Sequence, residues 1–121
     1  MPKLSQLAAD LAAGQSSSRQ LVEQSLARIS DSDGQGARTF ITVNAEAALA
    51  AAAAMDQLRA NGQAPSPLAG IPVSAKDLFD VAGQVTRAGS KVLAQQPPAT
   101  ADAPVIARLK AAGLIIIGRT N

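Results

Sequence analysis

The sequence predicts an α/β fold in which helices pack on a mixed or parallel sheet, and three observations lead to this prediction. Four segments have the apolar spacing or the propensity of helices, at residues 4–12, 17–30, 45–60 and 102–113. Three short runs have the length and composition of strands, at residues 39–43, 71–76 and 114–117. The order that results, helix, helix, strand, helix, strand, helix, strand, is typical of helices packed on a sheet.

The first two helical segments are short and amphipathic. The first carries leucines at helical spacing and is followed by Gly14, a stop signal. Ser17 and Gln20 have the spacing of a capping box, which predicts the start of the second helix. An apolar stripe continues from there, and we expect this helix to end near Ser30.

An extended segment and an alanine-rich helix come next. The β-branched and aromatic content of residues 39–43 predicts a strand. Asn44 offers a cap for a helix over residues 45–60, in which Met55 and Leu58 are expected to supply the packing face. The glycine and proline residues that follow predict a loop leading to the next strand.

The last helix and strand complete the pattern. Asp102 is expected to cap the helix, with Pro104 in its first turn and Gly113 at its end. The residues expected to face a core are Val105, Ile106 and Leu109. Residues 113–120 nearly fit the phosphate-binding pattern G-x-x-x-x-G-K-[ST], but strand formers stand where that loop needs free backbone N–H groups. We therefore interpret residues 114–117 as a buried strand and reject a phosphate site.

Composition and charge exclude several classes of function. Of the 121 residues, 47% are hydrophobic and 17% charged, which fits one globular unit, although much of the apolar content is alanine and the core is thin. The formal net charge of +2 comes from scattered basic residues without an aromatic stacking set, so we expect no nucleic-acid partner. Without a signal-peptide pattern or a window apolar enough to span a bilayer, we expect no membrane association and a cytoplasmic location.

The most informative side chain is Lys76, at the end of an apolar run. Ser74 and Lys76 should share one face of a strand, and Pro72 indicates the start or the edge of that strand. Burial would favour a neutral amine, which could act as a base. The chain contains no His and no Cys, which excludes Ser-His-Asp, Cys-His and the usual zinc sites within it but leaves a Ser-Lys arrangement open. The alternative is a lysine whose ammonium group simply reaches water.

Three separated blocks of residues resemble the amidase signature family in order and spacing. They are Pro67-Leu68-Ala69-Gly70-Ile71-Pro72-Val73-Ser74-Ala75-Lys76-Asp77, then Gly83 with Thr86-Arg87-Ala88-Gly89-Ser90, then Asp102-Ala103, Arg108-Leu109-Lys110-Ala111-Ala112-Gly113 and Ile117-Gly118-Arg119-Thr120-Asn121. The resemblance covers the chain from about Leu4 to its end, but only the beginning of the family's sequence. It implies the N-terminal portion of an amidase-signature-type fold, a single segment with a helical lead-in over residues 1–36 and an α/β part over residues 37–121.

The resemblance also implies hydrolysis of a carboxylic amide through a serine acyl-enzyme. Lys76 occupies the position of the base in the family's Ser-cis-Ser-Lys triad. The two serines belong to a segment expected after Gly118-Arg119-Thr120-Asn121, where this chain stops, so we expect the 121 residues alone to be inactive. Neither Ser74 nor Ser90 matches the nucleophile, and Ser90 reads as a structural turn residue. Asp77 is interpreted as structural, holding local backbone N–H groups.

The resemblance implies a small-molecule amide substrate and neither metal nor cofactor, and it leaves the substrate's identity and a homo-oligomer open. Arg119 stands where many relatives carry lysine, a change that keeps the charge. Two alternatives remain. One component of the glutamyl-tRNA amidotransferase shares these motifs and would need a glutamine pocket and partner subunits beyond residue 121. A non-catalytic α/β module would keep the scaffold without the chemistry.

Overall fold

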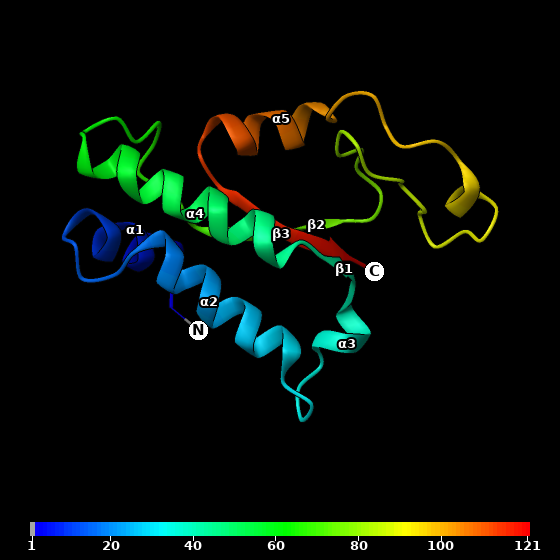
Figure 1. Cartoon of the computed structure of the whole chain (residues 1–121), viewed down its shortest axis with the longest axis horizontal. Coiled ribbons are helices and arrows are strands. Elements are labelled where there is room, and N and C mark those ends of the chain that lie inside the picture. The colour runs from blue at the N-terminus through cyan, green and yellow to red at the C-terminus, as the bar shows by residue number, and fades with distance from the viewer. Residues whose placement is uncertain (1) are drawn as a thin grey trace.

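A three-stranded sheet forms the centre of the computed structural model, which describes residues 2–121 (Figure 1). Its strands are β1 (Phe40–Val43), β2 (Pro72–Lys76) and β3 (Ile115–Thr120), in the order β1-β3-β2. β3 pairs antiparallel with β1 and parallel with β2, so the sheet is mixed. The predicted α/β fold, with helices packed on a mixed sheet, is confirmed.

Four helices of two turns or more accompany the sheet in the described part of the chain: α1 (Leu4–Ala12), α2 (Ser18–Ser30), α4 (Ala45–Ala60) and α5 (Pro104–Ala111). All four were predicted close to these bounds. Two shorter elements were not, α3 (Gly36–Thr39) and the 3-10 turn η1 (Leu93–Gln95), because three or four residues carry too little periodicity to be recognised. No helix within residues 2–121 has both the length and the apolar character needed to cross a bilayer.

Helices cover both faces of the sheet. One core joins buried residues of α2, α4 and β3: Val22, Ala48, Ala52, Ile115 and Ile117. A second joins β2, the segment after it and α5: Ala75, Val81 and Ile106, with Ile116 partly buried against them. A third, smaller core joins α1, α2 and the residue just before β2: Leu11, Leu21 and Ile71. Ile116 belongs to the second core because successive side chains of a strand point to opposite faces. The face with α2 and α4, which run side by side in Figure 1, is therefore opposite the face covered by α5.

The packing face of α4 differs from the prediction. Its buried residues are Ala48 and Ala52, and Met55 is only partly buried against the core. Leu58 is 37% exposed, so its assignment to the packing face is wrong. Helices approach one another to a distance that depends on the side chains at the contact, and the small methyl groups of alanine let α2 and α4 pack closely. Buried alanines thus lie at the centre of this contact, and larger apolar residues such as Leu49 and Met55 are partly buried around it.

Of the three predicted helix caps, one is confirmed. The backbone N–H of Gln20 donates to Ser17 Oγ at 3.1 Å and the N–H of Ser17 donates to Gln20 Oε1 at 3.0 Å, which is a complete capping box. Asn44 is at the N-cap position of α4, as predicted, but its side chain makes no capping hydrogen bond, and the N-cap position of α5 is Ala103 rather than Asp102. The Asp102 carboxylate instead accepts hydrogen bonds from the Ala82 N–H at 2.8 Å and from Lys110 Nζ at 2.9 Å. This carboxylate therefore ties the segment after β2 to the last turn of α5.

The orientation of α5 also corrects one prediction. Ile106 is buried as expected, with 1% of its surface exposed, and Leu109 is half-buried. Val105 is 41% exposed, so its expected place in the core is wrong. A short helix on one face of a small sheet buries a narrow stripe, and Val105, next to Ile106 along the helix, lies off that stripe.

The ion pair of Asp102 predicts a pH dependence of stability. The hydrogen bond from the Ala82 N–H, and then Lys110, hold the pKa of Asp102 below its usual value of 3.8. A carboxyl group with a lowered pKa in the folded state stabilises the fold above its unfolded-state pKa, and this contribution is lost as the pH falls through the folded-state pKa. We expect Asp102→Asn to lower Tm at neutral pH, and we expect the Tm difference from wild type to shrink when the pH falls below 3.8.

Thermal unfolding from neutral pH down to about pH 2 measures this effect. Asp33→Asn is the matched control, because Asp33 is exposed and its carboxylate has no hydrogen bond or ion pair within the described residues. The control should keep the same Tm difference from wild type at every pH. A constant difference for Asp102→Asn as well would show that the carboxylate's charge contributes nothing.

β3 extends further than predicted. The strand includes Arg119, and residues 115–119 are almost entirely buried despite this charge. The extended backbone also excludes a phosphate loop, because these residues use their backbone N–H and C=O groups in pairing with β1 and β2. A buried arginine in the central strand requires a partner, and that partner lies at the end of β2.

Candidate functional site

Lys76 is the last residue of β2, directly opposite Thr120 at the end of β3. β2 begins with Pro72 and lies at one edge of the described sheet, as predicted. Ser74 and Lys76 are both exposed while Ala75 between them is buried, so the predicted sharing of a face is confirmed. Since β2 and β3 are parallel, their carboxyl ends lie next to each other. Open α/β sheets commonly bind ligands at the carboxyl ends of their strands.

The surroundings of Lys76 differ from those of a buried, neutral base. Its side chain is exposed, and residues 2–121 provide its Nζ with no hydrogen bond and no ion pair. The apolar neighbours that suggested burial, such as Ile71 and Ala75, face the cores. Desolvation of Lys76, which the sequence suggested, is therefore not provided by the described residues. Within them, the ammonium group reaches water.

The charged pair beside Lys76 is buried. Arg119 Nη2 donates to Asp77 Oδ1 at 2.9 Å, and only 3% of the arginine side chain and 6% of the aspartate side chain are exposed. Asp77 Oδ1 also accepts the backbone N–H of Arg87 at 3.3 Å, which agrees with the expected structural role of this carboxylate. Its pairing with Arg119 was missed. A basic residue in a buried strand signals that it needs a partner, but the sequence alone does not say which acidic residue that partner is.

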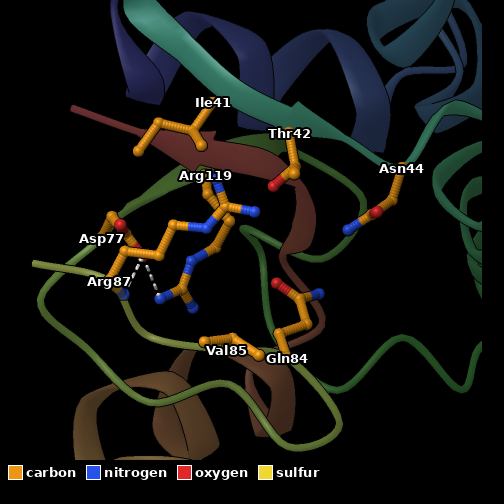
Figure 2. A pocket seen from close by; sticks show the side chains of 8 residues that line it. All are labelled: Ile41, Thr42, Asn44, Asp77, Gln84, Val85, Arg87 and Arg119. Carbon is orange, nitrogen blue, oxygen red and sulfur yellow. Dashed lines mark hydrogen bonds and ion pairs between the residues drawn. The ribbon is translucent and has the colours of Figure 1, made fainter. Parts of the chain in front are cut away.

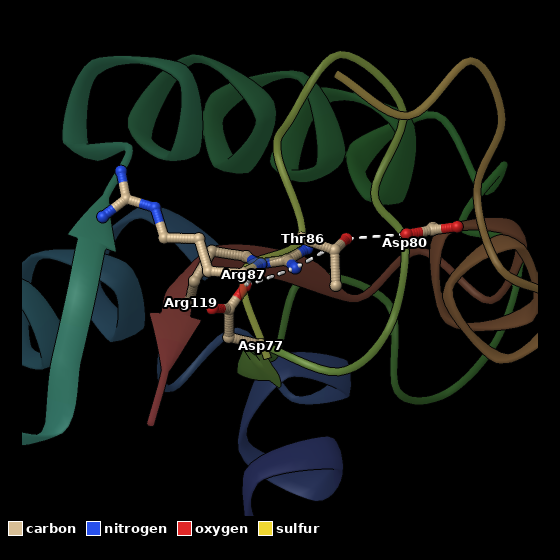
Figure 3. Close-up of polar contacts among 5 residues, drawn as sticks. All are labelled: Asp77, Asp80, Thr86, Arg87 and Arg119. Carbon is tan, nitrogen blue, oxygen red and sulfur yellow. Dashed lines mark hydrogen bonds and ion pairs between the residues drawn. The ribbon is translucent and has the colours of Figure 1, made fainter. Parts of the chain in front are cut away.

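A chain of polar contacts extends from this pair (Figure 3). Arg119 Nη2 also donates to Thr86 Oγ1 at 3.3 Å, and Thr86 Oγ1 donates to Asp80 Oδ1 at 2.7 Å. The contacts connect β3 with the segment that follows β2. They explain why the second motif block, residues 83–90, lies next to the first: its backbone and its threonine bind the charged pair at the end of the sheet.

A hollow of about 210 Å³ opens beside the pair (Figure 2). Its lining residues are Ile41, Thr42, Asn44, Asp77, Gln84, Val85, Arg87 and Arg119. Three buried polar atoms of the pair, Asp77 Oδ2 and Arg119 Nε and Nη1, have no hydrogen-bond partner within the described residues. The charges of the pair are thus only partly satisfied, and both groups keep capacity for further polar contacts on this side of the sheet.

The two serines near the motif, Ser74 and Ser90, are not paired with Lys76 in the described structure. Ser90 Oγ accepts the N–H groups of Val92 and Leu93 at 3.2 and 3.3 Å, so Ser90 is a turn residue, as predicted. Ser74 is exposed on β2. Neither side chain is hydrogen-bonded to Lys76. Within residues 2–121 no group of three or more His, Cys, Asp or Glu side chains is arranged to hold a metal ion.

The fold and this site define an α/β protein with charged residues gathered where two parallel strands end. The family model described as Amidase matches residues 20–121, and the chain belongs to this family. The resemblance that the motifs indicated is thereby confirmed.

Curated relatives match along almost the whole chain. It is 44% identical over 111 residues to the AtzE component of 1-carboxybiuret hydrolase from Pseudomonas sp. (strain ADP), covering 92% of this chain and 24% of the relative. It is 50% identical over 120 residues to the A component of glutamyl-tRNA(Gln) amidotransferase from Thiobacillus denitrificans, covering 99% of this chain and 24% of that protein. The chain therefore spans about a quarter of the length of the curated relatives it matches.

Solved structures show the same fold. Native peptide amidase from Stenotrophomonas maltophilia matches with a TM-score of 0.86 and 36% identity, covering 98% of this chain and 24% of that one. A structure described as a vestigial protein complex that reveals the origins of an s-triazine catabolic enzyme matches with a TM-score of 0.90 and 42% identity, over 99% of this chain and 26% of that one. The fold described above is thus found in enzymes of the amidase signature type.

Proposed function

We propose that the protein containing this chain hydrolyses a carboxylic amide to an acid and ammonia or an amine, with Lys76 as the base. The observation that carries the proposal is Lys76 itself, at the end of β2 within the first motif block of an Amidase family member. Support comes from the relatives, whose names include a peptide amidase and a component of a hydrolase. The two serines of the proposed triad lie outside the 121 residues, so this chain by itself is proposed to be inactive.

The proposed chemistry needs a proton relay. Neutral Lys76 takes a proton from a bridging serine, which takes one from the nucleophilic serine as its oxygen attacks the amide carbon. Backbone N–H groups stabilise the negative oxygen that forms. The proton then returns to the departing nitrogen, the C–N bond breaks, and an acyl-serine ester remains. Water hydrolyses this ester by the same relay, releasing the acid.

The substrate is proposed only as a class, a small molecule with a carboxylic amide. The walls of a complete pocket are proposed to come mainly from residues after Asn121, because Lys76 is open to solvent on its exposed face. Within residues 2–121, no charged side chain forms an ion pair with Lys76. The described residues therefore give no reason to propose a charged substrate.

The gene sequence beyond codon 121 and the activity of its complete product test the proposal together. We expect the reading frame to continue into a Gly/Ser-rich segment with two serines, and the purified product to release ammonia or amine from some members of a panel of amides. A stop codon directly after codon 121, or a product with paired serines that is inert toward the whole panel, would contradict the proposal and favour a non-catalytic module.

A second candidate is a component of an amidotransferase, and one observation favours it: the 50% identity to the A component of glutamyl-tRNA(Gln) amidotransferase. Such a protein would act on glutamine and would need partner subunits. Copurification with further subunits, together with ammonia release from glutamine in preference to other amides, would support this candidate. Activity of the isolated product on other amides would favour the hydrolase.

A further inference from the structure

We propose that Asp77 and Arg119 are positioning residues that hold Lys76 in place at the end of β2. The inference rests on the proposed role of Lys76 as a base. In this proposal the two side chains act through Lys76 rather than on the substrate, and this is a task beyond holding the fold together.

The position of the pair in the sheet is the first argument. Lys76 is opposite Thr120 in the register of β2 and β3, and the pair joins the residue after Lys76 to the residue before Thr120. The backbone N–H of Asp77 donates to the Thr120 carbonyl at 2.9 Å. One backbone hydrogen bond and one buried ion pair thus connect the two strands within one residue of Lys76. Without these contacts the end of β2 would fray, and the base would lose its fixed position.

The loop after Lys76 is held by the same aspartate. Its side-chain Oδ1 accepts the N–H of Arg87, and its backbone carbonyl accepts the N–H of Ala88 at 3.0 Å. Ala88 has a φ of 49°, the only positive φ of a non-glycine residue in the described chain. Such a conformation costs energy and persists where the surroundings impose it, and strain of this kind clusters at functional sites. Asp77 therefore connects the end of β2, next to Lys76, both to β3 and to the loop at residues 87–88.

The energetics of a buried pair give the third argument. A buried ion pair adds little net stability compared with apolar residues of the same volume, because both charges lose their hydration. This pair is also incompletely satisfied, with three polar atoms that lack partners among the described residues. What it offers is direction: besides the Nη2–Oδ1 contact, Asp77 Oδ1 accepts the Arg87 N–H and Arg119 Nη2 donates to Thr86 Oγ1, and directional polar contacts fix the orientation of both side chains more strictly than apolar contacts do. Fixed orientation is what a catalytic base requires.

The test uses the complete gene product and measures kcat and KM for amide hydrolysis. We expect Arg119→Met to lower kcat by about 10²-fold, the effect expected of a displacement of about 1 Å at a reacting group, while KM changes little. Arg119→Lys keeps the charge and should recover most of the lost kcat. Asp77→Asn keeps the shape of the side chain and should fall between the two. If Arg119→Met does not fold, the kcat values of Arg119→Lys and Asp77→Asn test the proposal in its place.

Val22→Ala is the matched control for a purely structural role. Val22 is fully buried in the core between α2, α4 and β3, so its truncation destabilises the fold without touching the pair. Assayed well below its Tm, it should keep the wild-type kcat. Wild-type kcat in Arg119→Met and Asp77→Asn, beside an inactive Lys76→Ala protein, would overturn the positioning role and leave the proposed function standing. Full activity of Lys76→Ala would overturn the proposed function, and the positioning role with it.

Discussion

Replacing Lys76 by alanine is expected to abolish amide hydrolysis by the complete gene product, lowering kcat by about 10⁴-fold or more. The amine is the only group in the described site proposed to accept a proton, and the described chain contains no histidine that could replace it. KM should change little, because the exposed lysine is proposed to act on the serine relay rather than on substrate binding. Steady-state release of ammonia from an amide that the wild type hydrolyses measures the effect.

Lys91→Ala is the matched control for Lys76→Ala. Lys91 is also exposed, lies in the segment before η1 and forms no ion pair within residues 2–121. Its replacement removes the same charge from the same protein but should leave kcat unchanged. Equal turnover of wild type and Lys76→Ala would remove the basis for a lysine-dependent mechanism. An equal loss in both variants would indicate an effect of net charge instead.

Replacing Gly70 by alanine is expected to cause a large loss of stability for a single added methyl group. Gly70 has a φ of +88°, and an added Cβ would lie 2.7 Å from Ser18 Cβ and 2.8 Å from Ser18 Oγ. The same serine donates a buried hydrogen bond to the Gly70 carbonyl at 2.6 Å, so it cannot move away without breaking this contact. Left-handed strain and overpacking together should cost about 3 kcal/mol. Urea denaturation followed by circular dichroism measures the free energy of unfolding.

Gly62→Ala separates the two contributions to this loss. Gly62 has a φ of +69°, but an added Cβ would meet nothing within 4 Å. Its replacement should therefore cost only the backbone strain, about 1–2 kcal/mol. The difference between the two variants measures the steric conflict with Ser18. Equal losses of unfolding free energy would mean that α2 shifts to make room for the new methyl group, so that the contact between α2 and the start of β2 adapts at little cost.

The regular elements could be predicted because their signals are local. The capping box of Ser17 and Gln20 and the alanine-rich segment of α4 need only a few neighbouring residues to be recognised. Lys76 could be placed at a strand end for the same reason. Asn44 and Asp102 make no capping hydrogen bond with their side chains, because a capping residue type indicates only what its side chain is able to do. The Asp102 carboxylate binds Ala82 and Lys110 instead, and its partner Ala82 is distant in sequence.

The rest of the site could not be predicted because it depends on pairing across long stretches of chain. Asp77 and Arg119 are brought together only by the parallel register of β2 and β3. No spacing rule connects them, since the crossover between the two strands includes a loop, η1 and α5. The exposure of Lys76 is a property of the same arrangement. Periodicity indicated an apolar run before Lys76. It could not show that the apolar side chains of this run pack into cores that Lys76 does not contact.

The central place of β3 in the sheet has a consequence for how the chain folds as it is made. Within residues 2–121, β1 and β2 pair only with β3, so their edges that face β3 stay unpaired until residues 115–120 have been synthesised. At about 5–20 residues per second, the ribosome needs about 2–9 s to pass from the end of β2 to the end of β3. Unpaired edges invite pairing with other chains during this interval. These three strands can therefore pair only after β3 has been made, and we expect nascent chains to be most open to aggregation just before then.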